Sequence, residues 1–370
     1  MKVVVIGTRG IPRIQGGVET HCEELYPRLA RLGCDVTVVR RSCYVTEENK
    51  EITFQGVQLK DIYAPRKKSI EAIVHTFLGV LYARKVGADV VHCHAVGPSI
   101  VIPFARLLGL KVVMTHHGPD YDRRKWGWLA KAMIKTGERW GVRFANQVIV
   151  ISHVIDQIIR TEYNRTDAHL IYNGTTRPLK TSRMDYLNKM NLEPRRYVMT
   201  LGRFVEEKGF DGLIRAYAHA SLKGYRLVIA GDADHENSYS QRLKALARHH
   251  EVVLTGFITG EPLNQLMTHA ALFVLPSFHE GLPISLLEAM SYDLPVLVSD
   301  IPANKEIGLP ADDYFRTGNW NSLATKLPLK LAAAEKLFAV GGEKKYDLTN
   351  YNWDYIAQQV LQVYKETVSK

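Results

Sequence analysis

Short apolar runs alternate with helical patterns along the first half of the chain. The apolar runs consist largely of Val and Ile and carry no polar residue at every second position. Continuous runs of this kind, joined by helices, are typical of a parallel sheet that is covered on both faces. The predicted strands are Val3–Ile6, Val36–Arg40, Val90–His92, Val112–Thr115 and Val148–Ile151, with helices over Glu19–Leu32 and Ile70–Arg84.

The same pattern starts again in the second half, after a polar and irregular stretch at Gly174–Arg195. We therefore predict two doubly wound, Rossmann-like α/β domains, 1–175 and 194–351, which face each other across a cleft at the carboxyl ends of their strands. A final helix within 352–370 is expected to cross back to the first domain. The second set of strands is Tyr197–Leu201, Arg226–Ala230, Val252–Thr255, Leu272–Leu275 and Val296–Ser299, with helices over Gly209–Ala220, Ser240–His249 and Pro283–Met290.

Length and composition agree with two domains of a globular protein. The chain has 370 residues, of which 46% are hydrophobic and 23% charged. It contains no apolar run of about 18 residues, and its start leads directly into a strand, so we expect neither a membrane span nor a signal peptide. We expect a cytoplasmic protein. Its four cysteines have no C-x-x-C spacing and are expected to be reduced, structural thiols.

The formal charge of +10 suggests a polyanionic partner. Arg66-Lys67-Lys68 and Arg123-Arg124-Lys125 each open a stretch in which cations alternate with aromatic and aliphatic residues at helical spacing. Such stretches form interfacial helices on an anionic membrane, or amphipathic helices that pack on the protein's own core. Both interpretations stay open. Nucleic acid is not expected, because no binding motif accompanies the charge.

A glycine pair lies between the first strand and the first helix. Gly16 and Gly17 would let backbone N–H groups approach an anion, and the helix that contains Glu19 would add its dipole. The spacing is neither that of a dinucleotide fingerprint nor that of a P-loop. A plain turn explains the pair equally well.

Two cations follow the first strand of the second half. Arg203 comes directly after Tyr197–Leu201, and Lys208 lies at the start of the next helix. An arginine offers a planar fork to two phosphate oxygens, while a lysine supplies a compact charge. This pattern predicts a diphosphate site. The alternative is that both cations only balance Glu206 and Glu207 at the surface.

Two carboxylates, Glu280 and Glu288, flank a predicted helix start near Leu282, where Pro283 suits the first turn. Glu280 would lie in the loop at the cleft, and Glu288 about 7–8 Å further along the helix axis. A single ligand reaches both only if it is extended, with a sugar at Glu280, a diphosphate at the helix end and a ribose at Glu288. The free N–H groups at the helix end belong to Leu282, Ile284 and Ser285.

Histidine supplies the remaining candidate. His117, in T-H-H-G after the strand Val112–Thr115, would contact a sugar hydroxyl or the leaving oxygen, although His116 competes for this role. Asp120 would orient His117 or hold the acceptor. We predict no metal, because Cys93 should point away from His92 and His94 on a strand.

Asp232-Ala233-Asp234 has the D-x-D pattern with which some glycosyltransferases hold a metal. It follows a glycine at the end of a strand, where a turn or a helix cap is the favoured interpretation. With Arg203 and Lys208 present, neutralising a diphosphate requires no metal or other cofactor.

The order of these motifs resembles the GT-B glycosyltransferases of the large retaining family 4. The resemblance extends over nearly the whole chain, through G-G-V-E at 16–19, T-H-H-G at 115–118, I-Y-N-G at 171–174, G-R-x5-K-G at 202–209 and E-x7-E at 280–288. The opening V-I-G-T-R-G-I-P and T-H-H-G-P-D-Y-D also resemble a bacterial branch that includes rhamnosyltransferases of cell-surface polysaccharides. One departure is Pro283, where many relatives have a glycine.

The resemblance implies a role for each matched residue. Arg203, Lys208, His117 and Glu280 would be catalytic, with the two cations on the donor diphosphate and Glu280 on the donor sugar. Glu19 and Asp120 would face the acceptor. The implied donor-binding set is Gly16, Gly17, Arg203, Lys208, Glu280, Gly281, Leu282, Ile284, Ser285 and Glu288.

The predicted reaction is transfer of a sugar from a nucleoside-diphosphate donor to a saccharide or polyprenyl-linked acceptor, with retention of configuration. An acceptor held at the inner face of the plasma membrane would suit the basic aromatic stretches. The alternatives are a sugar-nucleotide epimerase, a phosphorylase with pyridoxal phosphate, and a non-catalytic nucleotide-sugar binding protein.

Overall fold

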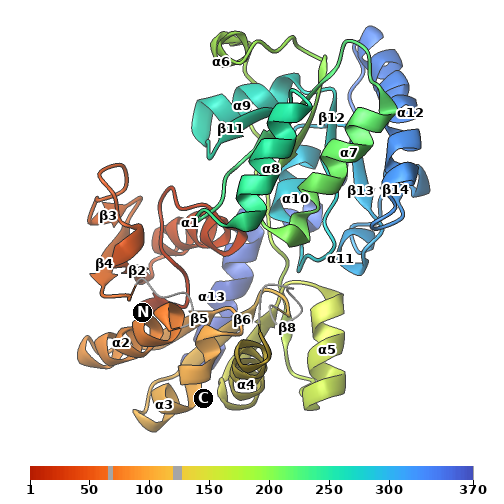
Figure 1. Cartoon of the computed structure of the whole chain (residues 1–370). Helices are drawn as coiled ribbons and strands as arrows, with labels where there is room; N and C mark the ends of the chain where they lie inside the picture. Colours follow the sequence, from red (N-terminus) through yellow and green to blue (C-terminus); the bar gives the residue numbers. More distant parts are fainter. Residues whose placement is uncertain (66–69, 120–126, 370) are drawn as a thin grey trace. The chain divides into compact units, whose positions relative to one another are not determined.

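A computed structural model describes residues 1–65, 70–119 and 127–369. The chain forms two compact units, one of residues 1–174 with 351–370 and one of residues 175–350 (Figure 1). Both are built on largely parallel sheets with helices between the strands, so the predicted α/β class is confirmed. Residues 175–193, expected to form the join, belong to the second unit, where helix α6 (Asp185–Lys189) packs on α9 (Gly260–His269).

The first unit has a sheet of order β3-β4-β2-β1-β5-β6-β7-β8 among the described residues. Only the β3–β4 pair is antiparallel. The central strands are almost fully buried, as their continuous Val and Ile runs predict. The strands are β1 (Lys2–Ile6), β2 (Asp35–Arg41), β3 (Thr53–Phe54), β4 (Val57–Ile62), β5 (Val90–His94), β6 (Val112–His116), β7 (Gln147–Val150) and β8 (His169–Leu170).

Helices cover both faces of this sheet. Helix α1 (Gly17–Arg31) packs beside the last helix, α13 (Trp353–Ser369), over one core. On the other face Gly79 of α2 lies against Ile6, and Gly141 of α4 against Met114, so close that a Cβ on either glycine would clash. The helices of this second face are α2 (Glu71–Lys85), α3 (Ile102–Leu107), α4 (Trp128–Phe144) and α5 (His153–Tyr163).

The second unit has an all-parallel sheet of order β11-β10-β9-β12-β13-β14. Its helices enclose a core centred on β9, β10 and β12. The strands are β9 (Tyr197–Leu201), β10 (Arg226–Ala230), β11 (Val253–Gly256), β12 (Leu272–Leu275), β13 (Val296–Ser299) and β14 (Tyr314–Phe315). The other helices are α7 (Phe210–Ala220), α8 (Ser238–His249), α10 (Ile284–Ser291), α11 (Pro302–Lys305) and α12 (Trp320–Ala339).

Each sheet has one point at which the strand order reverses. In the first unit this point lies between β1 and β5, and in the second between β9 and β12. Loops that leave the carboxyl ends of two such strands diverge and form a crevice where open α/β sheets bind ligands. The glycine loop follows β1, whereas Arg203 follows β9 and Glu280 follows β12. The topology therefore gathers the predicted site residues at these two points.

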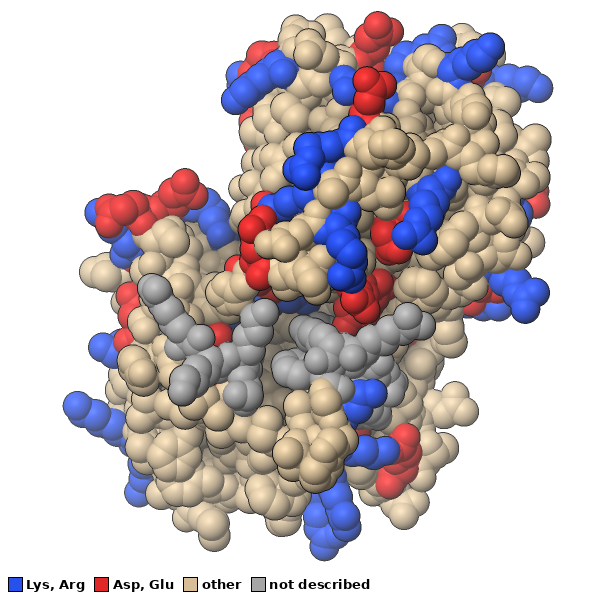
Figure 2. All heavy atoms as spheres, in the orientation of Figure 1, with Lys and Arg blue, Asp and Glu red and all other residues tan. Residues whose placement is uncertain are grey.

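Charged side chains of both signs share the visible surface of the protein (Figure 2). On the face shown in Figure 2, basic and acidic side chains are interspersed over both units. The clusters Arg66-Lys67-Lys68 and Arg123-Arg124-Lys125, and Asp120, lie outside the described residues. Within the described part of the chain no helix has the length and hydropathy needed to cross a membrane. All four cysteines are free.

Candidate active site

In the second unit, Lys208 and Glu280 meet in one ion pair. The Lys208 Nζ donates to Glu280 Oε1 at 2.7 Å, and Ser277 Oγ donates to the same oxygen at 2.6 Å. The two loops are also joined through the backbone, since the Phe278 N–H donates to the Glu207 carbonyl at 2.8 Å. The reversal point between β9 and β12 thus fixes a cation against a carboxylate, 72 residues apart in sequence.

The environment of Glu280 keeps it ionised. Burial by itself would raise the pKa of this carboxyl, but the charge of Lys208 and the hydrogen bonds from Lys208 and Ser277 outweigh burial, and the net pKa is below its usual value. The side chain is only 12% exposed. A buried carboxylate with one oxygen occupied by two donors can still accept a hydroxyl at its second oxygen. Glu280 is therefore suited to bind a hydroxyl-rich group.

Arg203 follows strand β9, and its side chain reaches the loop after β10. Its Nη1 lies 3.0 Å from Asp234 Oδ2, and both side chains are mostly buried. In the same loop, Asp232 accepts from the Ala233 N–H at 2.8 Å and pairs with Lys244 at 3.0 Å. Both carboxylates of the D-x-D pattern therefore have cationic partners within the second unit.

Helix α10 begins at Ile284, two residues later than predicted, and Pro283 is its N-cap in an extended conformation. The Pro283 carbonyl accepts from the N–H groups of Leu286 and Leu287. Among the described residues no backbone acceptor faces the N–H of Ile284 or Ser285, so the helix end can still bind an anion. Ser285 and Glu288 share one partly exposed side of an otherwise buried helix.

In the first unit, the glycine loop is fastened by Glu19. The Glu19 carboxylate is 5% exposed and accepts from Thr8 Oγ1 at 3.2 Å and from the Arg9 N–H at 3.1 Å. These contacts occupy the side chain that was predicted to face the acceptor, and they tie the loop to the first turn of α1.

The two glycines of this loop differ in the space around their Cα atoms. A Cβ on Gly16, at φ 153°, would lie 2.0 Å from Glu19, whereas a Cβ on Gly17 would meet no atom within 4 Å.

This difference predicts opposite results for the two alanine variants. Gly16→Ala should lower the free energy of unfolding by about 2 kcal/mol or more, because it adds a steric clash to a strained φ. Gly17→Ala should unfold as the parent protein does but raise the donor KM, since the new methyl group would occupy the space over the helix end. Thermal unfolding and donor titration check both. A Gly17→Ala enzyme with an unchanged donor KM would remove Gly17 from the donor site.

His117 lies in a cluster of buried aromatic and imidazole side chains at the end of β5 and β6. Its Nε2 is 2.9 Å from His94 Nδ1, and the two rings stack with centroids 5.2 Å apart. The ring of His21, from α1, packs edge-on against His117 at 4.9 Å. In turn Asn173 Oδ1 accepts from His21 Nδ1 at 2.9 Å, which leaves the second ring nitrogen as an acceptor.

Sequence reasoning missed the supporting members of this cluster. His21, Asn173 and Tyr26 were not predicted as site residues, although I-Y-N-G at 171–174 contains Asn173. The Tyr26 hydroxyl bonds to both His94 and His92, and the Tyr364 hydroxyl lies 2.6 Å from His92 Nδ1. Helical periodicity gives no sign that these polar groups would meet, because the members of the cluster come from five separate segments.

Burial keeps these imidazoles neutral. It lowers the pKa of His21 to about 4 against the opposing effect of Asn173, and holds the pKa of His94 and His117 well below the usual range, helped by the neighbouring histidines. A neutral His117 can donate a hydrogen bond or accept one near pH 7, but it adds no positive charge to the site. Any charge stabilisation of a leaving diphosphate must therefore come from elsewhere.

The neutral cluster makes the first unit sensitive to acid. Unfolding returns each histidine to a pKa of about 6.5, so between about pH 6.5 and pH 4 the unfolded chain binds protons that the folded chain excludes. The free energy of unfolding should fall by about 1.4 kcal/mol per pH unit for His21 as the pH is lowered through this window. Urea unfolding at several pH values measures the slope. His21→Gln should reduce it, whereas the exposed His219→Gln should not.

His116 holds the backbone beside His117. Its Nδ1 accepts from the Gly118 N–H at 3.1 Å, so its Nε2 carries the proton and donates to Glu138 Oε1 at 2.7 Å. Glu138 is fully buried in α4 and also accepts from Tyr163. His116 is therefore committed to structure, and of the two neighbouring histidines His117 is the one suited to contact a ligand.

Ring nitrogens of His21, His94 and His117 lie within 4.8 Å of one another, a spacing that could also suit a metal ion. In the structure, His94 and His117 use their facing nitrogens for the 2.9 Å hydrogen bond. Cys93 points to the opposite side and contacts Ser99, as strand alternation predicts. Independence from metal stays a prediction.

Comparison with known proteins agrees with this geometry. Residues 15–176 match the model of Glycosyltransferase Family 4, and residues 185–335 match the model of Glycosyl transferases group 1. The two matches cover the two units in turn. The chain belongs to the GT-B glycosyltransferases of family 4. Arg203, Lys208 and Glu280 all lie in the part of this glycosyltransferase that the second model covers.

Relatives of this glycosyltransferase span its full length. An uncharacterized glycosyltransferase of Methanocaldococcus jannaschii is 26% identical over 99% of this chain and 98% of its own. Alpha-maltose-1-phosphate synthase of Mycobacterium tuberculosis is also 26% identical, with 99% of each chain covered.

Solved structures show the same fold. Sucrose-phosphate synthase from Thermosynechococcus elongatus has a TM-score of 0.80 at 21% identity, with 100% of this chain and 99% of that chain covered. Anabaena HepE in complex with UDP-glucose has a TM-score of 0.79 at 18% identity, with 99% of this chain and 100% of that chain covered.

Proposed function

We propose that this glycosyltransferase transfers a sugar from a nucleoside-diphosphate donor to an acceptor hydroxyl with retention of configuration. The observation that carries the proposal is the Lys208–Glu280 pair at 2.7 Å, at the reversal point of the second sheet where Arg203 also follows β9. Cations of a kind suited to phosphate and a carboxylate suited to hydroxyls follow neighbouring strands at this point. Among the relatives in structure, HepE was solved with UDP-glucose, which favours a nucleotide-sugar donor here.

In this mechanism the cations stabilise the leaving diphosphate. Lys208 has three N–H donors, and its bond to Glu280 leaves others for phosphate oxygens. Arg203 exchanges part of its contact with Asp234 for the diphosphate. Because the transition state separates a cationic sugar from an anionic leaving group, fixed charges at the phosphate lower the barrier. Glu280 and Glu288 hold the sugar and ribose hydroxyls, and His117 contacts the donor sugar.

The acceptor is proposed to be a saccharide or a polyprenyl-linked saccharide in cell-surface polysaccharide synthesis. The opening V-I-G-T-R-G-I-P and T-H-H-G-P-D-Y-D support this through their resemblance to the rhamnosyltransferase branch. Rhamnose is therefore the first sugar to test. Glu19 is committed to the glycine loop, so other groups of the first unit must bind the acceptor hydroxyl.

A panel of nucleoside-diphosphate sugars, scored by release of the nucleoside diphosphate, tests the proposal. We expect release with one donor class, stimulation by acceptor, and no loss of activity after treatment with EDTA, since Arg203 and Lys208 provide the positive charge. Formation of an isomeric sugar nucleotide without acceptor would instead identify an epimerase. Donor binding without any release would identify a binding protein. Loss of activity with EDTA, restored by a divalent ion, would overturn the metal-independent mechanism.

A further inference from the structure

Helix α4 exposes a basic and aromatic surface on the first unit. Trp128 is 77% and Leu129 66% exposed, and Trp140 and Phe144 are each about 40% exposed. Large apolar side chains exposed in such numbers along one helix are uncommon on a soluble protein and mark an interaction surface. The exposed cations of the same helix are Lys131, Lys135, Arg139 and Arg143.

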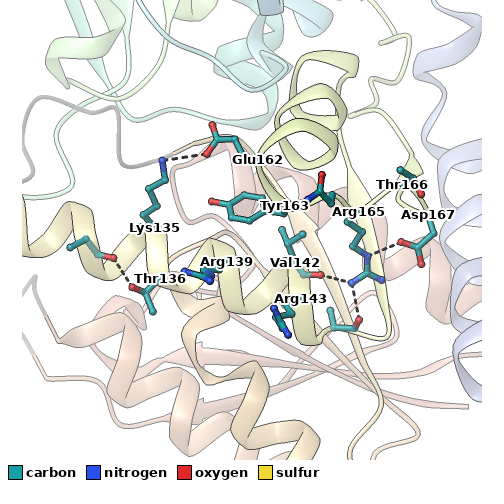
Figure 3. A pocket seen from close by; sticks show the side chains of 13 residues that line it. Lys135, Thr136, Arg139, Val142, Arg143, Glu162, Tyr163, Arg165, Thr166 and Asp167 are labelled. Atoms are coloured by element: carbon teal, nitrogen blue, oxygen red, sulfur yellow. Dashed lines mark hydrogen bonds and ion pairs between the residues drawn. The ribbon is translucent and has the colours of Figure 1, made fainter.

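A groove runs between α4 and the segment that ends α5, and the four apolar side chains lie outside its lining. It has a volume of about 1040 Å³. Figure 3 shows the α4 side chains along one side and residues 162–167 on the other. Four cations and two carboxylates line it, which gives a net charge of +2. The ionic lining is Lys135, Arg139, Arg143, Arg165, Glu162 and Asp167.

The two carboxylates are already paired. Glu162 lies 3.3 Å from Lys135, and Asp167 lies 2.8 Å from Arg165. Arg165 is further committed to structure, because it donates to the carbonyls of Val142, Ala145 and Asn146 at the end of α4.

The excess charge therefore belongs to Arg139 and Arg143. Among the described residues neither has a carboxylate partner, and they lie one turn apart on the same helix face. Like charges at this spacing repel each other, and an anion between them would relieve the repulsion. Guanidinium groups are the cations best suited to bind phosphate oxygens in pairs. Arg143 also lies over the exposed Phe144 ring, which places the cation beside an apolar side chain.

We propose that this groove binds the phosphate of an anionic phospholipid headgroup, with α4 lying against the membrane surface. A groove lined by cations, on a helix that also exposes Trp, Leu and Phe outside the groove, matches the layered chemistry of a bilayer interface better than that of a free anion. Only the benefit of this membrane contact rests on the proposed function, because the contact would bring the enzyme to a lipid-linked acceptor. Helix α4 lies within the second of the two basic stretches, so the proposal assigns the interfacial interpretation to that stretch.

Flotation with phosphatidylcholine vesicles, with and without phosphatidylglycerol, tests the proposal on the full chain. The parent protein should bind the anionic vesicles at low salt and detach at high salt. Arg139→Gln/Arg143→Gln should lower the partition coefficient about 25-fold, or about five-fold for each arginine. The matched control is Arg215→Gln/Arg248→Gln, which removes two exposed arginines of the second unit and should bind as the parent does.

The remaining outcomes separate the lipid from other sources of charge. Trp128→Ala/Leu129→Ala should weaken binding to anionic vesicles while leaving both arginines in place. An equal loss in the control variant, unchanged binding of Arg139→Gln/Arg143→Gln, or no binding by the parent protein would each overturn the proposal. Full displacement by soluble glycerol phosphate would also overturn it, in favour of a small-anion site. Sugar transfer to a soluble acceptor, measured on the same preparations as release of nucleoside diphosphate, reports separately on the proposed function.

Discussion

Replacing Lys208 by alanine is expected to lower kcat/KM by about a thousandfold while the protein remains folded. The ammonium group is the only cation that the described structure places directly on Glu280, and its loss removes charge from the leaving diphosphate when that charge develops. Removal of one preorganised donor of this kind commonly costs a factor of 10² to 10³. The variant also leaves the buried Glu280 carboxylate without its counter-ion, which adds to the loss.

Steady-state kinetics with the preferred donor, together with thermal unfolding, measures this effect. The control is Lys223→Ala, which removes an exposed lysine from the same unit and should leave kcat/KM unchanged. The decrease should appear in kcat, because the missing interaction matters most in the transition state. A Lys208→Ala enzyme within about threefold of the parent in kcat would exclude Lys208 from stabilising the leaving group.

Replacing Glu280 by glutamine should lower kcat/KM by about a hundredfold. The amide keeps the shape of the side chain and can still bond to Lys208 and Ser277, but it loses the charge-assisted bond to a donor hydroxyl, worth about 1.5–3 kcal/mol. Because the pKa of Glu280 lies below its usual value, this carboxylate stays ionised at neutral pH and should add no step to the activity profile above about pH 5.

The contrast with Glu288→Gln sharpens this prediction. Glu288 lies on α10, and its proposed partner is a ribose that does not change during the reaction. Loss of the Glu288 carboxylate should therefore raise the donor KM and leave kcat unchanged.

The pH dependence of the free energy of unfolding gives a second measurement on Glu280. The lowered pKa of Glu280 contributes stability above the unfolded value of about 4.5 and loses it as the pH falls through the folded value. If Glu280→Gln changed only KM, a role for Glu280 in the transition state would be wrong.

The sequence predicts the strands of this fold better than the polar contacts of the site. Buried parallel strands are continuous apolar runs, and β1, β6, β9 and β12 could be found from that pattern alone. The longest helix, α12, was not predicted, and it contains Pro328 in its interior, a residue that normally argues against a helix.

The site was predicted residue by residue but not as contacts. Lys208 and Glu280 were each assigned to the donor, yet their ion pair depends on the strand order β9–β12, which sequence spacing does not reveal. The same holds for Asp234 beside Arg203. A local pattern gives the type of residue, whereas the pairing follows from which strands become neighbours.

Helix α13 has a consequence for how the chain is made. The second unit is encoded within the first, because the chain returns at residue 351 to complete a core that began at residue 1. During synthesis from the N-terminus, the second unit can fold while the first still lacks Trp353, Ile356 and Tyr364. The unit that begins at the N-terminal side is thus completed only after the second unit. The Tyr364–His92 hydrogen bond, which supports the histidine cluster, cannot form until the residues that follow the second unit have been synthesised.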